Sequence, residues 1–116
     1  MDAWEFTDIE AARAATGRPY HEFVSVPDLS AGIYTLDAGA TDLQRPHTED
    51  ELYYVVAGRG VVTVGDETRP VVPGSVVFVA AGVPHRFHDI AERLELLVMF
   101  GPAEDSRATP SPKGAA

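Results

Sequence analysis

Two histidines have neighbours with which they could bind a metal ion. His47 belongs to the run Arg45-Pro46-His47-Thr48-Glu49-Asp50-Glu51, and His85 closes the run Gly82-Val83-Pro84-His85. The imidazole of His47 and the carboxylate of Glu51 are four residues apart, and His85 adds a second imidazole from a distant segment. Two neutral nitrogens and one anionic oxygen can occupy one face of a divalent transition metal and leave positions for water or substrate. Histidines beside an acidic loop are also common on protein surfaces.

The segments that must position these side chains have the pattern of β-strands. Short runs rich in Val, Ile, Tyr and Phe alternate with Gly, Pro and Asp between Tyr20 and Phe100. The predicted strands are residues 22–26, 32–36, 51–56, 61–64, 76–79, 85–88 and 94–100. Residues 57–60, 65–66 and 72–74 are predicted turns because they are rich in Gly, Pro and Asp. No helical segment of βαβ length intervenes, which indicates an all-β sandwich or barrel.

The two ends of the chain differ from this middle part. Residues 1–19 are predicted to form a helical arm, with a capping box at Thr7 and Glu10 and a left-handed cap at Gly17. Its apolar anchors are predicted to be Trp4, Phe6 and Ile9. Residues 20–101 form the predicted barrel. Residues 102–116 lack apolar periodicity and are predicted to be a disordered tail.

Length, charge and cysteine content limit the classes of function that the protein can have. The 116 residues suit one domain, and a formal net charge of −9 argues against binding to nucleic acid or to an anionic membrane. The absence of cysteine excludes disulfides, thiolate metal sites and a cysteine nucleophile. No secretion signal or long apolar run stands out, so we expect a cytoplasmic protein.

Two spaced motifs in this chain resemble those of the cupin superfamily. The spacing of Gly39, position 45, His47, Glu51 and Gly58 is similar to the first cupin motif, and the stretch from Gly74 through Gly82 and His85 to position 89 is similar to the second. The resemblance implies a small single-domain jelly-roll β-barrel with a metal inside its mouth.

Carried over position by position, the resemblance makes His47, Glu51 and His85 metal ligands. The family's first histidine is replaced by Arg45, whose guanidinium has no lone pair to offer. The site then has three protein ligands, or Gln44 or a water fills the gap, or the chain holds no metal. Glu49 competes with Glu51 for the carboxylate role, and the spacing to Gly58 favours Glu51.

Two further residues are candidates for catalysis. An inward-facing Arg45 could grip a substrate carboxylate or phosphate in a bidentate fashion, although it could equally face solvent or pair with Asp42 or Glu49. Tyr53 shares a strand face with Glu51 and could donate or accept a proton. We expect Tyr34 and Phe78 either to line the cavity or to pack in the core. His88 is expected to be a surface or packing residue, since it lies three residues past His85.

Together these expectations indicate a metal-dependent enzyme that acts on a small organic substrate. The metal would be Fe, Mn, Ni or Zn. Iron would suit dioxygenase chemistry, whereas zinc or manganese would suit isomerase, cyclase or rearrangement chemistry. The alternative is a noncatalytic cupin that binds a small molecule without a functional metal. Similar cupins commonly pair through their barrel edges, which implies a homodimer.

Overall fold

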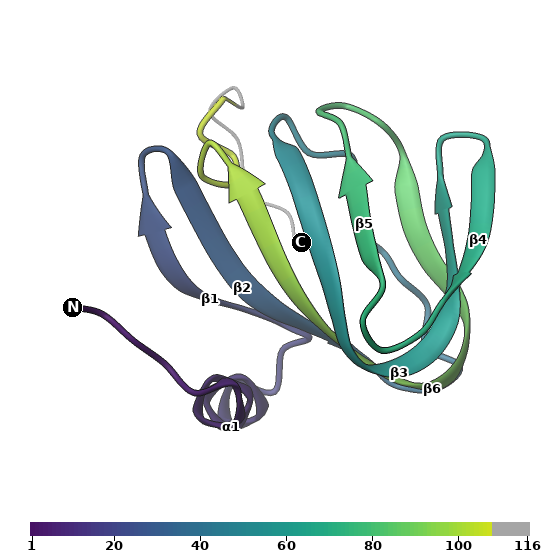
Figure 1. The fold of residues 1–116 in the computed structure, drawn as a ribbon, viewed down its shortest axis with the longest axis horizontal. Coiled ribbons are helices and arrows are strands. Elements are labelled where there is room, and N and C mark those ends of the chain that lie inside the picture. Colours follow the sequence, from purple (N-terminus) through teal and green to yellow (C-terminus); the bar gives the residue numbers. More distant parts are fainter. Residues whose placement is uncertain (108–116) are drawn as a thin grey trace.

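A computed structural model describes residues 1–107 and contains one helix and an antiparallel sheet (Figure 1). The elements are α1 (Phe6–Thr16), β1 (Tyr20–Val26), β2 (Leu29–Leu36), β3 (Asp50–Val64), β4 (Glu67–Val71), β5 (Val76–Val79) and β6 (His85–Gly101). The strand order is β1-β2-β6-β3-β4, and β5 pairs with β3. The all-β prediction with a short N-terminal helix is therefore confirmed.

Two long strands, β3 and β6, form the spine of the sheet. The start of β3 pairs with the end of β6, as Glu51 with Phe100, and the end of β3 pairs with the start of β6, as Val64 with His85. Between these halves the pairing is irregular on both sides of Arg59. Figure 1 shows both strands bending sharply here, so that the two halves of the sheet rise on either side of a shared interior. Bulges increase local bending, which is why one sheet can fold over itself.

The predicted turn at residues 57–60 is wrong, because this stretch is the bend inside β3. Gly58 has a φ of 93°, and a Cβ there would lie 2.0 Å from the carbonyl oxygen of Arg93 on β6. Glycine is needed here both for the left-handed backbone and for the close approach of the neighbouring strand. A glycine-rich segment has the sequence signal of a turn, so the sequence predicts two strands, at 51–56 and 61–64. In the structure they are two parts of one strand, β3.

The other predicted turns are confirmed. Residues 65–66 join β3 to β4, and residues 72–74 lie between β4 and β5. No strand was expected at β4, because its residues Glu67 to Pro70 are exposed and largely polar. The strands predicted at 85–88 and 94–100 are the two halves of β6.

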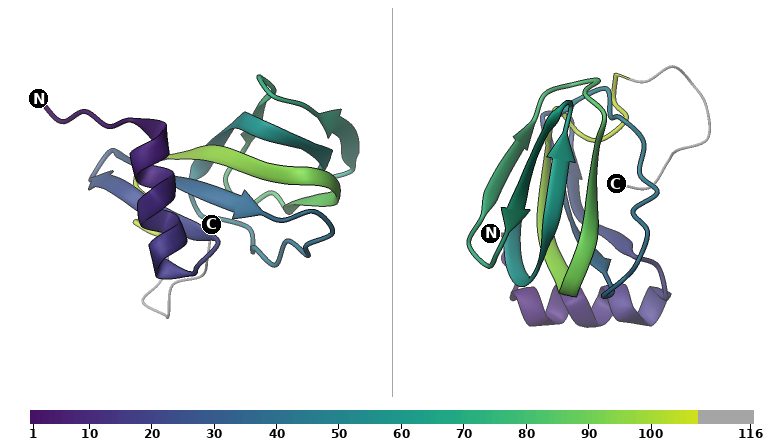
Figure 2. Two further views of the ribbon diagram at one scale, coloured as in Figure 1. Left: turned by 90° about the horizontal axis from the view of Figure 1, so that it is seen from below. Right: turned by 90° about the vertical axis from the view of Figure 1, so that its right-hand side faces the viewer.

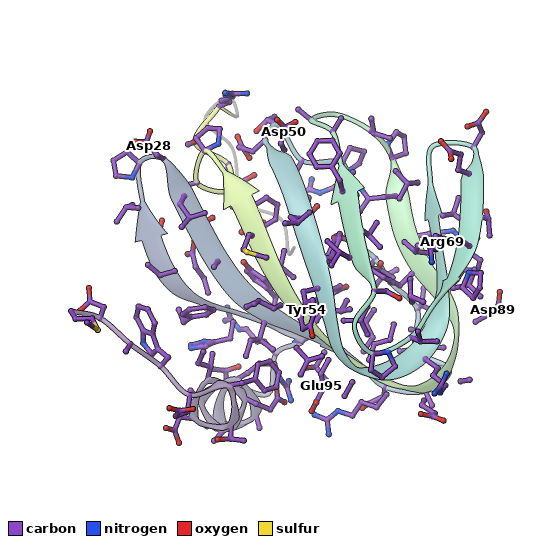
Figure 3. All side chains as sticks on the ribbon, in the orientation of Figure 1. Asp28, Asp50, Tyr54, Arg69, Asp89 and Glu95 are labelled. Atoms are coloured by element: carbon purple, nitrogen blue, oxygen red, sulfur yellow. The ribbon has the colours of Figure 1, made fainter. Side chains whose placement is uncertain are left out.

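The core lies inside the curve of the sheet. Its largest buried members on β6 and β3 occupy alternate positions, which is the pattern expected of strands with one inward face. These core residues are Tyr53, Val55, Val62, Phe87, Leu94, Leu96, Val98 and Phe100. Tyr54, labelled in Figure 3, lies on the opposite face of β3 and is 41% exposed.

The helix α1 lies across one end of the sheet against β1 and β2 (Figure 2). It is held by Ile9, which is buried, and by Glu10, whose carboxylate accepts hydrogen bonds from Thr35 on β2, from Arg13 and from Arg93. Gly17 ends it in the left-handed conformation, as predicted. The predicted capping box is wrong, because the helix starts at Phe6 and the carbonyl of Glu5 accepts its first hydrogen bonds. Trp4 packs edge-on against Phe23 and is half exposed.

The segment after β6 is fixed by hydrogen bonds as far as Arg107. The amides of Asp105 and Arg107 donate to Glu49, and the amide of Glu104 donates to Ser30 Oγ. Residues 102–107, which the sequence predicted to begin a disordered tail, therefore lie against the barrel instead. The rest of that predicted tail, 108–116, lies outside the described residues.

Candidate metal centre

His47, Glu51 and His85 converge inside the sheet. Each offers one ligand atom, and these atoms all lie within 4.8 Å of one another. His85 Nε2 is 3.1 Å from Glu51 Oε1, and His47 Nε2 is 4.0 Å from the same oxygen. Glu51 is 1% exposed, and each histidine is 7% exposed. Burial of two imidazoles and a carboxylate around one point is the arrangement that a divalent transition metal needs.

Three separate structural features bring these side chains together. Glu51 lies on the inward face of β3, and His85 is the first residue of β6. His47 precedes β3, and its carbonyl accepts a hydrogen bond of 2.7 Å from the amide of Gly82. Asp50, labelled in Figure 3, likewise accepts from the amide of Ala81 at 2.9 Å. These two hydrogen bonds connect the segment before β6 with the segment that leads into β3. Both histidines therefore reach the same part of the interior.

The cluster contains buried polar atoms without hydrogen bonds. His47 Nε2 and both carboxylate oxygens of Glu51 are inaccessible to solvent and have no hydrogen-bond partner among the described residues. A buried polar group left in this state costs about 1–3 kcal/mol. A cation at the centre would bind all three atoms at once. The donor set therefore fits a metal ion, and the orphaned atoms are the structural sign of that fit.

The ring of His85 is oriented by a backbone carbonyl. Its Nδ1 lies 2.9 Å from the carbonyl oxygen of Val83, which can only accept, so Nδ1 carries a proton. In the neutral ring Nε2 then presents its lone pair toward Glu51. Burial lowers the pKa of His85, but the contact with Glu51 and the Val83 carbonyl outweigh it and raise the pKa.

His47 is held from its other side by the C-terminal segment. Its Nδ1 is 3.6 Å from Glu104 Oε2, while Phe100 packs edge-on against the ring at 4.8 Å. Burial lowers the pKa of His47, which favours the neutral imidazole that binds metals, although Glu51 opposes this shift. A carboxylate on the far nitrogen is the usual partner of a metal-binding histidine.

Tyr53 and Gln44 form a second polar group beside the cluster. The Tyr53 hydroxyl donates to Gln44 Oε1 at 2.7 Å and lies 3.1 Å from His85 Nε2. Gln44 Nε2 donates to Asp42 Oδ2 at 2.7 Å, and the buried Asp42 also accepts from the Tyr34 hydroxyl and the Phe87 amide. Burial raises the pKa of Tyr53 well above its ordinary value, as does the charge of Glu51, so the phenol stays protonated.

Other predicted residues lie elsewhere. Arg45 is exposed, and no hydrogen bond or ion pair joins it to another residue within 1–107. Phe78 is 60% exposed, so the expectation that it lines the cavity or packs in the core is wrong. Tyr34 is buried with its hydroxyl on Asp42. His88 binds Thr63 Oγ1 and Asp89 outside the cluster, in line with the prediction.

Sequence reasoning missed the roles of Asp42, Glu49 and Glu104. Glu49, the competing candidate for the carboxylate ligand, is 1% exposed and has other partners. It accepts hydrogen bonds from the amides of Asp105 at 2.7 Å and Arg107 at 2.9 Å, and from the Thr48 hydroxyl. Burial raises its pKa, but these three donors outweigh the effect and lower it. Nothing in the sequence indicated a role for Glu104, because its segment has the composition of a disordered tail.

No helix within residues 1–107 has the length and apolar character to span a bilayer.

Comparisons with known proteins agree with this fold. The uncharacterized protein SCO3923 of Streptomyces coelicolor is 51% identical over 104 residues, covering 90% of this chain and 99% of that protein. The structure of KdgF from Halomonas sp. is similar with a TM-score of 0.67 at 25% identity, over 76% of this chain and 82% of that one. An RmlC-like cupin from Shewanella frigidimarina gives 0.65 at 25% identity, over 72% and 75%.

The family assignment rests on the matched segment as well as on these folds. The model of the cupin domain matches residues 32–100, which run from β2 to the end of β6 and include all three clustered residues. The jelly-roll prediction is confirmed by the solved neighbours. The chain is a small single-domain member of the cupin family.

Proposed function

We propose that this cupin is a metal-dependent enzyme acting on a small organic substrate, with His47, Glu51 and His85 as ligands of a divalent transition metal. The observation that carries the proposal is the set of buried atoms without hydrogen bonds that converge inside the barrel: His47 Nε2 and the two oxygens of Glu51. A site with a purely structural role would be expected to satisfy these atoms with protein donors.

The residues around the ligands support the same proposal. The Val83 carbonyl fixes the ring of His85 and leaves its Nε2 for the metal, and Glu104 stands at the Nδ1 side of His47. Such outer partners orient imidazole ligands and raise their basicity. The ligands are therefore arranged before any ion arrives, which lowers the free-energy cost of binding one.

The metal would supply Lewis acidity, or with iron a centre for dioxygen, at positions the protein does not occupy. Tyr53 would serve as a proton donor there, because its raised pKa keeps the phenol protonated beside His85. Arg45, exposed two residues before His47, is the candidate for holding an acidic group of the substrate. A two-histidine, one-carboxylate set favours dioxygenase chemistry with iron over isomerase or cyclase chemistry with zinc or manganese.

A noncatalytic cupin that binds a small molecule without a functional metal is the second candidate. It is favoured by one observation, which is that the family's first histidine is replaced by an exposed arginine that forms no hydrogen bond or ion pair within the described residues. On this view the polar interior would bind an organic ligand through Tyr53 and Gln44.

Elemental analysis decides between the two. The protein is grown with added iron, manganese, nickel and zinc, and the wild type is compared with His47→Ala, Glu51→Ala and, as the control, His88→Ala. We expect about one metal ion per wild-type and H88A chain and a strong loss in the other two variants. Wild-type protein without metal would overturn the enzyme proposal. Oxygen uptake with candidate substrates then separates dioxygenase from Lewis-acid chemistry.

A further inference from the structure

We propose that the side-chain carbonyl oxygen of Gln44 is the fourth protein ligand of the metal and takes the place of the family histidine that Arg45 replaces. This inference rests on the proposed metal site and adds to it a donor of a different chemical type. Gln44 is one position earlier in the chain than the missing histidine.

The first argument is distance. Gln44 Oε1 lies 3.2 Å from His85 Nε2, and Glu51 Oε1 lies 3.1 Å from the same nitrogen. Two ligand atoms that are each about 2.1 Å from one ion, at right angles to each other, are about 3.0 Å apart. Both oxygens are therefore separated from the His85 nitrogen as neighbouring ligands in one coordination shell would be.

The second argument is the orientation of the amide. Gln44 Nε2 donates to Asp42 Oδ2 at 2.7 Å, and an ionised carboxylate can only accept. The nitrogen must therefore face Asp42, and the oxygen must face the metal site. Asp42 is itself fixed by the hydroxyl of Tyr34 at 2.7 Å and by the amide of Phe87 at 2.8 Å. This network holds the carbonyl oxygen toward His85 and Tyr53.

The third argument is the count of donors and acceptors. Because Nδ1 of His85 faces the Val83 carbonyl, Nε2 is the ring nitrogen that a metal ion can reach. Gln44 Oε1 and Glu51 Oε1 both carry lone pairs and lie within 3.2 Å of that nitrogen. The Tyr53 hydroxyl donates into this group and reaches Gln44 Oε1 at 2.7 Å. A cation satisfies several facing acceptors at once, which a single hydroxyl proton cannot do.

The inference is tested by titration of the metal-free protein with Co²⁺, whose visible spectrum reports the number and type of its ligands. Wild type is compared with Gln44→Ala and with Gln44→Met, which keeps the length of the side chain and removes the carbonyl. Leu43→Ala is the matched control, because Leu43 is the other chain neighbour of Gln44 and is 81% exposed. Competition with a chelator gives the dissociation constants, and circular dichroism checks the fold of each variant.

We expect both Gln44 variants to bind Co²⁺ roughly 10- to 100-fold more weakly and with an altered spectrum, while L43A stays within about twofold of wild type. An unchanged spectrum in Q44M would overturn the inference, whether or not affinity falls, because the ligand set would be intact. If Q44A does not fold, Q44M alone decides. Wild-type protein that binds no Co²⁺ would instead overturn the proposed function, which distinguishes the two failures.

Discussion

His85 Nε2 lies 3.1 Å from Glu51 Oε1, although the two residues are at opposite ends of the β3–β6 ladder. Along the ladder Glu51 is opposite Phe100, and His85 is opposite Val64. The bend that both strands make near Glu95, labelled in Figure 3, folds these ends toward each other. The cluster of His47, Glu51 and His85 is therefore a consequence of the bend, and residues that stabilise the bend also hold the cluster together.

Gly58 is predicted to be essential to that bend. Gly58→Ala places a Cβ 2.0 Å from the Arg93 carbonyl oxygen at a φ of 93°, so backbone of β6 has to move. Gly74→Ala is a matched control, because its φ is 94° but nothing lies within 4 Å of the added Cβ. We expect G74A to cost about 1–2 kcal/mol in the free energy of unfolding and G58A at least about 2 kcal/mol more. Urea denaturation measures both, and equal losses would contradict the role given to the close approach.

Glu49 is predicted to fasten residues 102–107 to the barrel. Glu49→Gln weakens the acceptance of the Asp105 and Arg107 amides, since a neutral amide group replaces a charge-assisted acceptor. We expect hydrogen exchange at these two amides to accelerate about tenfold, with a loss of about 1–2 kcal/mol in unfolding free energy. Glu22→Gln, on the exposed side of β1, is the control. Unchanged protection of both amides in E49Q would show that other contacts hold the segment.

Glu10 is predicted to make the docking of α1 depend on pH. Burial raises the pKa of Glu10, but its contacts with Arg13, Thr35 and Arg93 outweigh this and lower it below the ordinary value of 4.5. A lowered folded-state pKa stabilises the protein above the unfolded value, and this contribution is lost as the pH falls through the folded-state pKa. We expect the free energy of unfolding of wild type to exceed that of Glu10→Gln by about 1–2 kcal/mol at pH 7 and pH 6. This difference should shrink below pH 4.5.

Thermal and urea unfolding of both proteins between pH 7 and pH 3 measure this difference. Glu92→Gln is the control, because Glu92 is 64% exposed and its pair with Arg59 spans 3.8 Å. Exposed pairs of this kind contribute little to stability. A difference between wild type and E10Q that grows as the pH falls would mean that the sign of the linkage is wrong.

The homodimer stays a prediction, and β5 offers a surface on which to test it. Val76 is 58% exposed and Phe78 is 60% exposed on this strand, which pairs with β3. Covering these apolar side chains with a second copy would stabilise a dimer. We expect Phe78→Ser to shift the molar mass measured by light scattering toward the monomer, while Leu43→Ser, 81% exposed on the loop before β3, leaves it unchanged. A wild-type monomer at high concentration would exclude this dimer.

The sequence by itself determined the local features of the protein. Alternation of apolar residues predicted most of the strands, and Gly17 marked the end of the helix. The spacing of His47, Glu51 and His85 identified the candidate ligands that the fold brings together. These features could be predicted because each depends on a few neighbouring residues. The ligand spacing also carries the family's motif, which is specific enough to indicate the fold.

Only the tertiary structure decided how distant segments meet. The sequence around Gly58 predicts a turn, because a glycine-rich segment suits a turn and a strand bend equally well. Only the close approach of the Arg93 carbonyl on the neighbouring strand shows that this segment is a bend. Likewise Glu49 and Glu51 are both acidic and both buried, and only their partners show that one anchors the chain after β6 while the other faces two imidazoles. Contacts between residues far apart in the chain depend on the geometry of the whole sheet, which no short stretch of sequence encodes.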